Sequence, residues 1–194
     1  MNENGDITTL VKQSQKGHIP SFEQLVLKYS NQIYNLALRI LGDEHEAQDV
    51  VQDTFLAAYE KIDTFNFNSH FYTWLYRIAT NFALMKIRKH KNMPVSESDF
   101  EHHYEVPFEE SAVSHFIKAD DYLVNKELRE KLEEAINQLP PIYKTVFILR
   151  DLEELSIKET AEILSITESN VKIRLKRARI FLKEYLEKVF ADEV

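Results

Sequence analysis

The sequence predicts an all-α protein made of two small helical domains joined by an acidic linker. Along the 194 residues, apolar side chains recur every three or four positions, which is the period of an α-helix rather than of a strand. Only three glycines and five prolines interrupt these runs. Hydrophobic residues make up 44% of the chain, which is enough for one moderate core or two small ones.

The distribution of charge favours two cores. Residues 92–138 contain twelve acidic and four basic residues, and they carry the whole net charge of −8 because the segments on either side are balanced. From 92 to 114 the sequence has two prolines and no sustained helical stripe, as is typical of a linker. We therefore expect domains at 15–92 and 122–190, with an acidic flexible linker at 93–121. The acidic residues keep this tether soluble and extended, or shield basic surfaces in the free protein.

Three or four helices are expected in the first domain, and three can be traced. A stripe of apolar residues from Phe22 to Ile40 predicts the first, with Ser21 as its N-terminal cap and Gly42 as its C-terminal cap. The second is expected over about Glu44 to Ile62. Its outward face is strongly acidic and contains Asp43, Glu44, Glu46, Asp49, Asp53 and Glu60.

The third helix of this domain is expected over about Phe71 to His90, and it is basic. Trp74 and Phe82 lie on its apolar stripe and are expected in the core. No acidic residue occurs in the segment 64–96. The same segment contains five cations, namely Arg77, Lys86, Arg88, Lys89 and Lys91.

A polar and aromatic loop precedes this basic helix. Aromatic rings beside cations suit unpaired nucleic-acid bases, which stack on the rings or form hydrogen bonds along their edges. Core packing is the alternative, and for Phe65 and Phe67 the sequence favours neither. The loop consists of Phe65, Asn66, Phe67, Asn68, Ser69 and His70.

The second domain ends in a helix-turn-helix pattern. Ser156 and Glu159 form a capping box at the start of a short helix, and after a sharp turn Thr167 can cap a longer second helix. The second helix of such a pair lies in the major groove of DNA. A solvated basic helix in a bundle is the alternative. Outside its apolar stripe this helix carries six cations, Lys172, Arg174, Lys176, Arg177, Arg179 and Lys183.

The composition argues against several other classes of protein. There is no cysteine, and hence neither a disulfide nor a thiolate metal site. Nothing resembles a signal peptide or a membrane span, so we expect a cytoplasmic protein without membrane insertion. The best candidates for metal ligands are interpreted more simply as a solvated acidic face. Since no nucleophile has a nearby base, we expect no enzyme, no cofactor and no metal site. Those candidates are His45, Glu46, Asp49 and Asp53.

Three motifs, in this order, resemble the extracytoplasmic-function (ECF) sigma factors of bacterial RNA polymerase, which belong to the sigma-70 family. The resemblance spans nearly the whole chain. The motifs are Glu46-Ala47-Gln48-Asp49-Val50-Val51-Gln52-Asp53-Thr54-Phe55, then Phe71-Tyr72-Thr73-Trp74-Leu75-Tyr76-Arg77-Ile78-Ala79-Thr80-Asn81, and finally Arg174-Leu175-Lys176-Arg177-Ala178-Arg179.

The resemblance implies roles for the first domain. Its acidic helix would dock on the clamp of the polymerase β-prime subunit. The loop 65–70, assisted by Asn81, would capture a base flipped out of the minus-ten promoter element. The end of the third helix would hold nearby phosphates. The docking residues would be Asp49, Gln52 and Asp53, and the phosphate contacts would be Arg88, Lys89 and Lys91.

The resemblance also implies that the second domain, a partner of the β flap, binds the minus-thirty-five promoter element. Ile173 favours contact with a thymine methyl over a hydrogen bond. Arg174 and Arg179 could equally be phosphate contacts. The positions on the recognition helix that would face the bases are Lys172, Ile173, Lys176 and Arg177, and Asn170 is a further candidate contact to this element.

The implied mechanism is binding without chemistry: the protein directs core polymerase to promoters and helps to melt the minus-ten element. Relatives are often held inactive by an anti-sigma factor, which is therefore an expected partner. Two alternatives remain open. A sigma-like decoy that binds only a regulator would be expected to lose the basic recognition face, and a helix-turn-helix repressor or activator would leave the first domain without a function.

Overall fold

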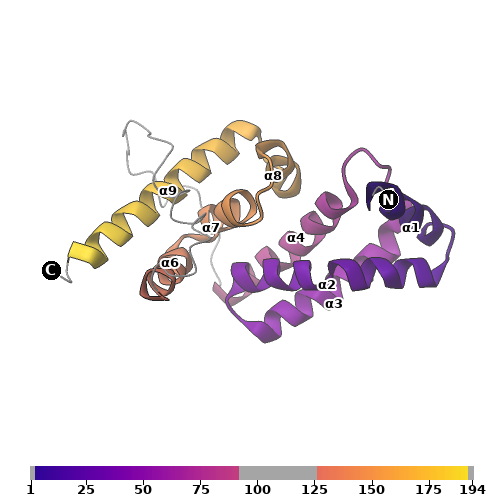
Figure 1. The fold of residues 1–194 in the computed structure, drawn as a ribbon, viewed down its shortest axis with the longest axis horizontal. Helices are drawn as coiled ribbons and strands as arrows, with labels where there is room; N and C mark the ends of the chain where they lie inside the picture. Colours follow the sequence, from indigo (N-terminus) through magenta and orange to yellow (C-terminus); the bar gives the residue numbers. More distant parts are fainter. Residues whose placement is uncertain (1–2, 92–125, 192–194) are drawn as a thin grey trace. The chain divides into compact units, whose positions relative to one another are not determined.

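The computed structural model describes residues 3–91 and 126–191, and all regular structure in these ranges is helical (Figure 1). The all-α prediction is therefore confirmed for the described residues. The chain divides into two compact units, and each is described by itself. The linker expected at 93–121 lies outside the described ranges.

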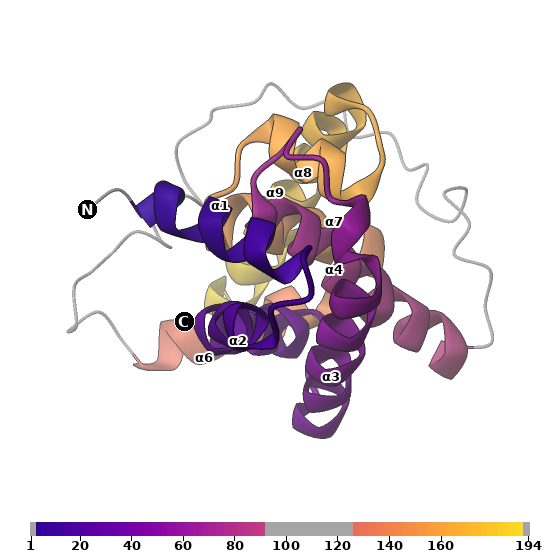
Figure 2. The same ribbon diagram turned by 90° about the vertical axis from the view of Figure 1, so that its right-hand side faces the viewer.

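The N-terminal unit packs its helices around α2. This helix contacts α1, α3 and α4, and α3 also packs against α4. Figure 2 views α2 nearly along its axis, with α3 and α4 on one side of it. The completely buried side chains include Val11, Leu25, Ile33, Leu36, Val50 and Leu75. The elements are α1 (Glu3–Ser14), α2 (Ile19–Leu41), α3 (Glu44–Lys61), the single 3₁₀ turn η1 (Ile62–Thr64) and α4 (Phe71–Lys91).

The sequence predicted the C-terminal end of α2 correctly but not its N-terminal end. Gly42 ends the helix as expected, in the left-handed conformation with φ 75°, and its N–H donates to the carbonyl of Leu38. The expected cap at Ser21 is wrong, because the helix begins at Ile19 with a proline in its first turn, a position that proline favours. The hydroxyl of Ser21 instead donates to Oε1 of Gln13 at 2.5 Å.

Helix α1 was not expected from the sequence, which placed no element before residue 15. It has few apolar residues, and its buried side chains in the described part are Leu10, Val11 and Ser14. Within the helix, the hydroxyl of Ser14 donates to the carbonyl of Leu10. The helix is held mainly by its contact with α2, which a local sequence pattern does not reveal.

The C-terminal unit contains the predicted helix-turn-helix pair, formed by α8 and α9. Ser156 and Glu159 form the expected capping box: the Ser156 N–H donates to Oε2 of Glu159 at 2.8 Å, and the Glu159 N–H donates to Oγ of Ser156 at 3.1 Å. Thr167 caps α9 by accepting the N–H of Asn170 at 3.2 Å. The elements are α6 (Lys126–Gln138), α7 (Pro141–Phe147), the π-helical turn η3 (Ile148–Leu152), α8 (Ile157–Leu164) and α9 (Glu168–Ala191).

The core of this unit lies between α9 and the helices that precede it. α9 packs against α7 and α6, and Val171, Ala178 and Leu182 are completely buried, as the apolar stripe predicted. The side chains that complete this core include Val146, Phe147, Ile148 and Leu149. In neither described range is any helix both long and apolar enough for a membrane span.

Candidate nucleic-acid interface

The loop between η1 and α4 places its two phenylalanines differently. Phe65 is 5% exposed and lies in an aromatic cluster, with ring centroids 5.6 Å from Phe71 and 5.5 Å from Trp74. Phe67 is 40% exposed, and its ring meets that of Phe65 edge to face at 4.9 Å. Core packing therefore accounts for Phe65, whereas Phe67 presents a ring to solvent.

The turn that carries Phe67 is tight. Its backbone has φ 62°, in the left-handed region that bulky residues rarely adopt. The side chain of Asn66 accepts the N–H of Asn68 at 3.2 Å, which closes a local turn around Phe67. At the start of the loop, the amide of Gln15 donates to the carbonyls of Ile62 and Phe65 at 2.9 and 2.8 Å.

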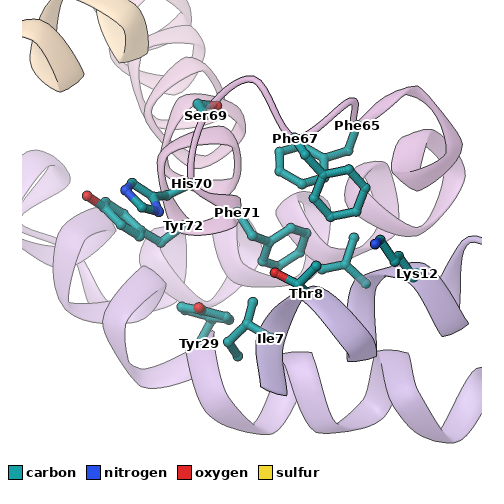
Figure 3. A pocket seen from close by; sticks show the side chains of 11 residues that line it. Ile7, Thr8, Lys12, Tyr29, Phe65, Phe67, Ser69, His70, Phe71 and Tyr72 are labelled. Atoms are coloured by element: carbon teal, nitrogen blue, oxygen red, sulfur yellow. The ribbon is translucent and has the colours of Figure 1, made fainter. Parts of the chain in front are cut away.

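A pocket of about 470 Å³ opens beside this loop. Figure 3 shows Phe67 and Phe71 beside Thr8 and Lys12 of α1. The rings of His70 and Tyr72 also line the pocket, and they are stacked with their centroids 5.4 Å apart. Of the predicted base-capture residues, the structure places Phe65, Phe67, Ser69 and His70 in the lining; Asn66, Asn68 and Asn81 are not part of it. The full lining is Ile7, Thr8, Val11, Lys12, Tyr29, Phe65, Phe67, Ser69, His70, Phe71 and Tyr72.

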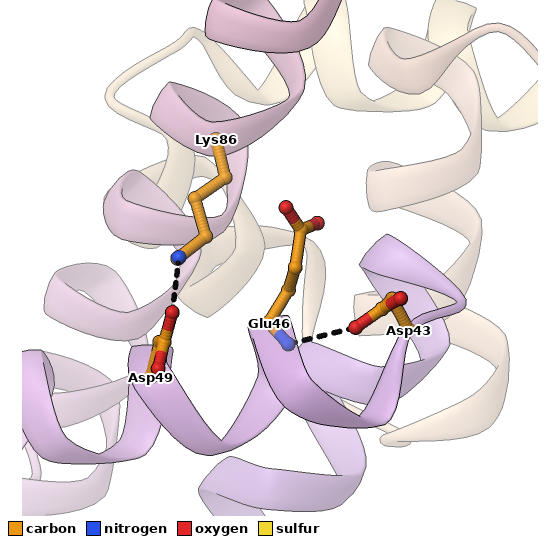
Figure 4. Close-up of polar contacts among 4 residues, drawn as sticks. All are labelled: Asp43, Glu46, Asp49 and Lys86. Atoms are coloured by element: carbon orange, nitrogen blue, oxygen red, sulfur yellow. Dashed lines mark hydrogen bonds and ion pairs between the residues drawn. The ribbon is translucent and has the colours of Figure 1, made fainter.

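The acidic face of α3 lies beside the basic helix α4. Asp43 caps α3 by accepting the N–H of Glu46 at 2.8 Å, and Nζ of Lys86 pairs with Oδ2 of Asp49 at 2.9 Å (Figure 4). The hydrogen bond to Asp49 raises the pKa of Lys86 above its usual value, and the charges of Asp49, Glu46 and Asp53 act in the same direction against partial desolvation. Opposite charges on the two helices are thus joined within one unit.

The predicted docking residues Asp49, Gln52 and Asp53 are all exposed on α3. The same face also carries an apolar residue not expected there from the sequence, Leu56, which is 61% exposed. Its position, seven residues after Asp49, is the signal that could have revealed it.

On α4, Asn81, Arg88 and Lys89 are exposed, as a DNA-binding role requires. Lys91 is the last residue of the helix, and its side chain lies outside the described part of the chain.

Two arginines of α9 are bound to other elements of the C-terminal unit. Arg177 donates from Nη1 to the hydroxyl of Tyr143 at 3.1 Å, and Arg179 forms a two-pronged ion pair with the carboxylate of Asp151 at 2.9 and 2.8 Å. Both arginines therefore brace α9 against the rest of its unit. Lys172 and Ile173 are exposed at the start of the helix together with Asn170, and Ile173 is 47% exposed.

Known proteins match both parts of this architecture. The family model for Sigma-70 region 2 matches residues 25–93, and that for Sigma-70 region 4 matches residues 129–182. The chain is 38% identical over 176 residues to the ECF RNA polymerase sigma factor SigW of Bacillus subtilis, covering 91% of this chain and 94% of that protein. It is 33% identical over 180 residues to the ECF RNA polymerase sigma-E factor of Escherichia coli K12, covering 92% and 93%.

The chain belongs to the ECF RNA polymerase sigma factor family. The resemblance inferred from the three sequence motifs is thereby confirmed, and this sigma factor directs RNA polymerase to promoters. Among solved structures, the sigma factor RpoE of Bartonella quintana, in complex with the anti-sigma factor NepR, has a TM-score of 0.62 and 25% identity. That alignment covers 86% of this chain and 96% of that one.

A second solved structure supports the fold. CnrH, in complex with the cytosolic domain of CnrY, has a TM-score of 0.66 and 23% identity, with 94% and 98% of the two chains covered. The family is not known for enzymatic activity. Within residues 3–91 and 126–191, this sigma factor has no group of three or more His, Cys, Asp or Glu side chains placed to hold a metal ion.

Proposed function

We propose that this sigma factor binds core RNA polymerase through the acidic face of α3, captures an unpaired base of the minus-ten element at the loop 65–70, and binds the minus-thirty-five element through α9. In this proposal residues 15–92 act as region 2, residues 93–121 as the tether, and residues 122–190 as region 4. The protein contributes binding only, because core polymerase performs the nucleotidyl transfer.

One observation carries the proposal: α4 connects the pocket to a line of exposed side chains. Phe71, its first residue, lines the pocket. Arg77, Asn81, Met85 and Arg88 are exposed, and their spacing of four, four and three residues places them on one side of the helix. At a rise of 1.5 Å per residue this line is about 17 Å long. A DNA strand that leaves the pocket can therefore follow α4 with its phosphates beside cations.

The acidic face of α3 is suited to docking on a basic partner. Asp49, Gln52 and Asp53 share their face of α3 with an exposed apolar side chain, Leu56, and apolar contact beside polar groups is typical of protein interfaces. Because Asp49 is paired with Lys86 in the free protein, docking on the β-prime clamp exchanges one cation for another at this carboxylate.

The exposed start of α9 is suited to the major groove. Lys172 and Asn170 supply hydrogen bonds and charge, and Ile173 supplies an apolar contact. The capping of α9 by Thr167 is compatible with this role, since it orders the first turn of the helix.

An anti-sigma factor is the second expected partner. The sigma factor RpoE of Bartonella quintana, whose fold this chain shares, was solved with its anti-sigma factor NepR. A regulator of this kind would compete with core polymerase for the faces of α3 and α9. The expected result is that purified core enzyme displaces any protein that copurifies with the chain, and simultaneous binding of both would contradict it.

The primary test is pull-down with purified bacterial core RNA polymerase, followed by in vitro transcription across a genomic fragment library. We expect binding and a defined set of start sites, which would supply both promoter elements. Asp49→Ala should weaken binding to core, whereas Glu23→Ala, an exposed acid on α2, should not. Failure of the wild-type chain to bind core would overturn the proposal.

The role of α9 is tested by salt dependence. Promoter affinity of the complex should fall with salt at a log-log slope of about −0.9 per phosphate contact. Lys172→Ala should make this slope shallower by about 0.9 if Lys172 contacts a phosphate. Arg177→Ala should weaken promoter use as well, partly because it removes the bond to Tyr143. Unchanged promoter affinity in both variants would contradict the assignment of α9.

A further inference from the structure

Helix α1 lies outside the segment that matches Sigma-70 region 2, since the match begins at residue 25. The helix nevertheless supplies part of the pocket beside the loop 65–70, through Ile7, Thr8, Val11 and Lys12. The pocket is therefore built from α1, Tyr29 of α2 and residues 65–72, and of these only α1 lies outside the matched region.

Gln15, directly after α1, holds the base of this loop. A neutral side-chain amide offers two N–H donors, and here Nε2 donates to the carbonyls of Ile62 and Phe65 at 2.9 and 2.8 Å. These carbonyls lie at the start of η1 and at the first residue of the loop. Their positions determine where the chain turns toward Phe67, so the amide fixes the loop before any ligand binds.

Lys12 contacts the ring of Phe67 in the same loop. Its Nζ lies 5.7 Å from the centre of the Phe67 ring, within the range of a cation–π contact. The backbone of Phe67 is left-handed. Its side chain is 40% exposed, so part of the ring faces solvent rather than other side chains. The contact with Phe65 restrains one edge of the ring, and Lys12 restrains one face.

We propose that α1 forms one wall of the minus-ten capture pocket, with Gln15 as a positioning residue for the loop and Lys12 as a contact for the captured nucleotide. This inference rests on the proposed function. The pocket volume of about 470 Å³ falls in the range of roughly 300–1,000 Å³ typical of small-ligand sites. Its lining combines aromatic faces with the hydroxyl groups of Thr8 and Ser69, as an unpaired base requires. A loop that is ordered in advance loses less entropy when the base enters.

The test uses holoenzyme reconstituted from the full chain and core polymerase. The probe is a fork-junction promoter, taken from the start sites found by transcription, whose minus-ten non-template strand is unpaired. Gln15→Ala should weaken binding about tenfold, since it removes two hydrogen bonds to partly buried carbonyls at the start of the loop. Lys12→Met keeps the apolar stem and removes the charge, and should weaken binding about threefold.

A set of abasic probes distinguishes positioning from general damage. Each unpaired base is replaced in turn by an abasic site. At the captured position the wild-type and Gln15→Ala holoenzymes should then bind equally, because the pocket is empty in both. A tenfold loss that persists at every abasic position would show a general structural defect and overturn the inference, as would equal binding of the wild-type and variant holoenzymes to the intact probe.

Matched variants complete the design. Lys16→Met removes an exposed cation next to Gln15 that does not line the pocket, and Gln24→Ala removes an exposed amide from α2; neither should change binding. Gln15→Glu retains the size of the side chain but removes the donors, so it tests the same bonds if the alanine variant fails to fold. If no abasic position weakens the wild-type holoenzyme, base capture itself is wrong and α1 has no such role. If the wild-type chain does not bind core polymerase at all, the proposed function itself is wrong, and this result differs from the outcomes that overturn only the role of α1.

Discussion

The two surfaces proposed to bind DNA are constructed in opposite ways. The capture pocket combines α1, the loop 65–70 and the first residues of α4, and its key bonds join residues 47 and 50 positions apart. The recognition surface of α9 consists of neighbouring residues on the first turns of one helix, Asn170, Lys172 and Ile173. The contacts that support α9 come from arginines further along the same helix.

The two surfaces differ in whether the residues that hold the structure in place are also those proposed to contact DNA. In the pocket, Lys12 and Phe65 both restrain the loop and line the site, so a change at either alters both, whereas Gln15 restrains the loop without lining the pocket. On α9, the supporting residues Arg177 and Arg179 lie one to three turns beyond the residues at the exposed start. We therefore expect substitutions to have mixed effects in the pocket and separable effects on α9.

The largest effect is expected from Phe65→Ala. This substitution removes a buried ring from an aromatic cluster and should destabilise the N-terminal unit by about 3 kcal/mol or more. Phe67→Ala removes an exposed ring and should cost well under 1 kcal/mol while reducing promoter opening. Hydrogen exchange of amides in α2–α4 measures the first effect, and transcription from duplex promoters measures the second. Equal destabilisation by both substitutions would contradict the assigned burial.

The second largest effect is expected at the ion pair between Arg179 of α9 and Asp151. Asp151→Ala leaves the guanidinium of Arg179, whose side chain is only 16% exposed, without its carboxylate. We expect a loss of about 3 kcal/mol in the stability of the C-terminal unit. Removing both partners in Asp151→Ala/Arg179→Met should restore much of this stability, because the largely buried guanidinium is then removed together with its carboxylate. Hydrogen exchange of amides in α7 and α9 provides the measurement, and a fully additive double variant would contradict the explanation.

A smaller effect is expected at Ile173, where recognition is separable from support. If this exposed side chain contacts a thymine methyl, replacing that thymine by deoxyuridine should weaken promoter binding about threefold, the equivalent of one buried methyl group. Ile173→Ser should show no further loss with deoxyuridine, and its stability should match that of the wild type. Deoxyuridine at each thymine of the minus-thirty-five element can be tested in turn, and the absence of any effect would remove Ile173 from the base contacts.

The smallest effect is expected at the pair between Lys86 and Asp49, because both side chains are partly exposed. The pKa of Lys86 is raised in the folded protein, so the pair stabilises the fold at pH values below the ordinary lysine pKa of 10.5 and loses this contribution as the pH rises through the raised value. Asp49→Asn should return the pKa of Lys86 toward 10.5. An NMR titration of Lys86 measures the change, and identical titration curves would contradict the pairing.

The sequence predicted those features that depend on local spacing. The capping box at Ser156, the cap at Thr167 and the left-handed Gly42 follow from residue types a few positions apart, and all three are confirmed. The exposed cations of α4 and the acidic face of α3 follow from helical periodicity in the same way.

The features that the sequence did not predict depend on contacts between distant segments. Gln15 has no local pattern that marks it, because both of its acceptors are backbone carbonyls that any residue would provide. The same holds for Arg179, which resembles every other cation of α9 until Asp151 is seen beside it. Spacing reveals which face a side chain occupies, but not which distant atom it meets there.

The two arginines of α9 also fix the rotation of this helix about its own axis. Arg177 and Arg179 are two residues apart, so at 100° per residue they leave the helix about 200° apart, and each is bound to a different element, Tyr143 of α7 and Asp151 of η3. A helix held from two sides cannot roll when its solvent-facing residues change. If Asn170, Lys172 and Ile173 contact the promoter as proposed, they can therefore be exchanged without moving the scaffold that holds the helix.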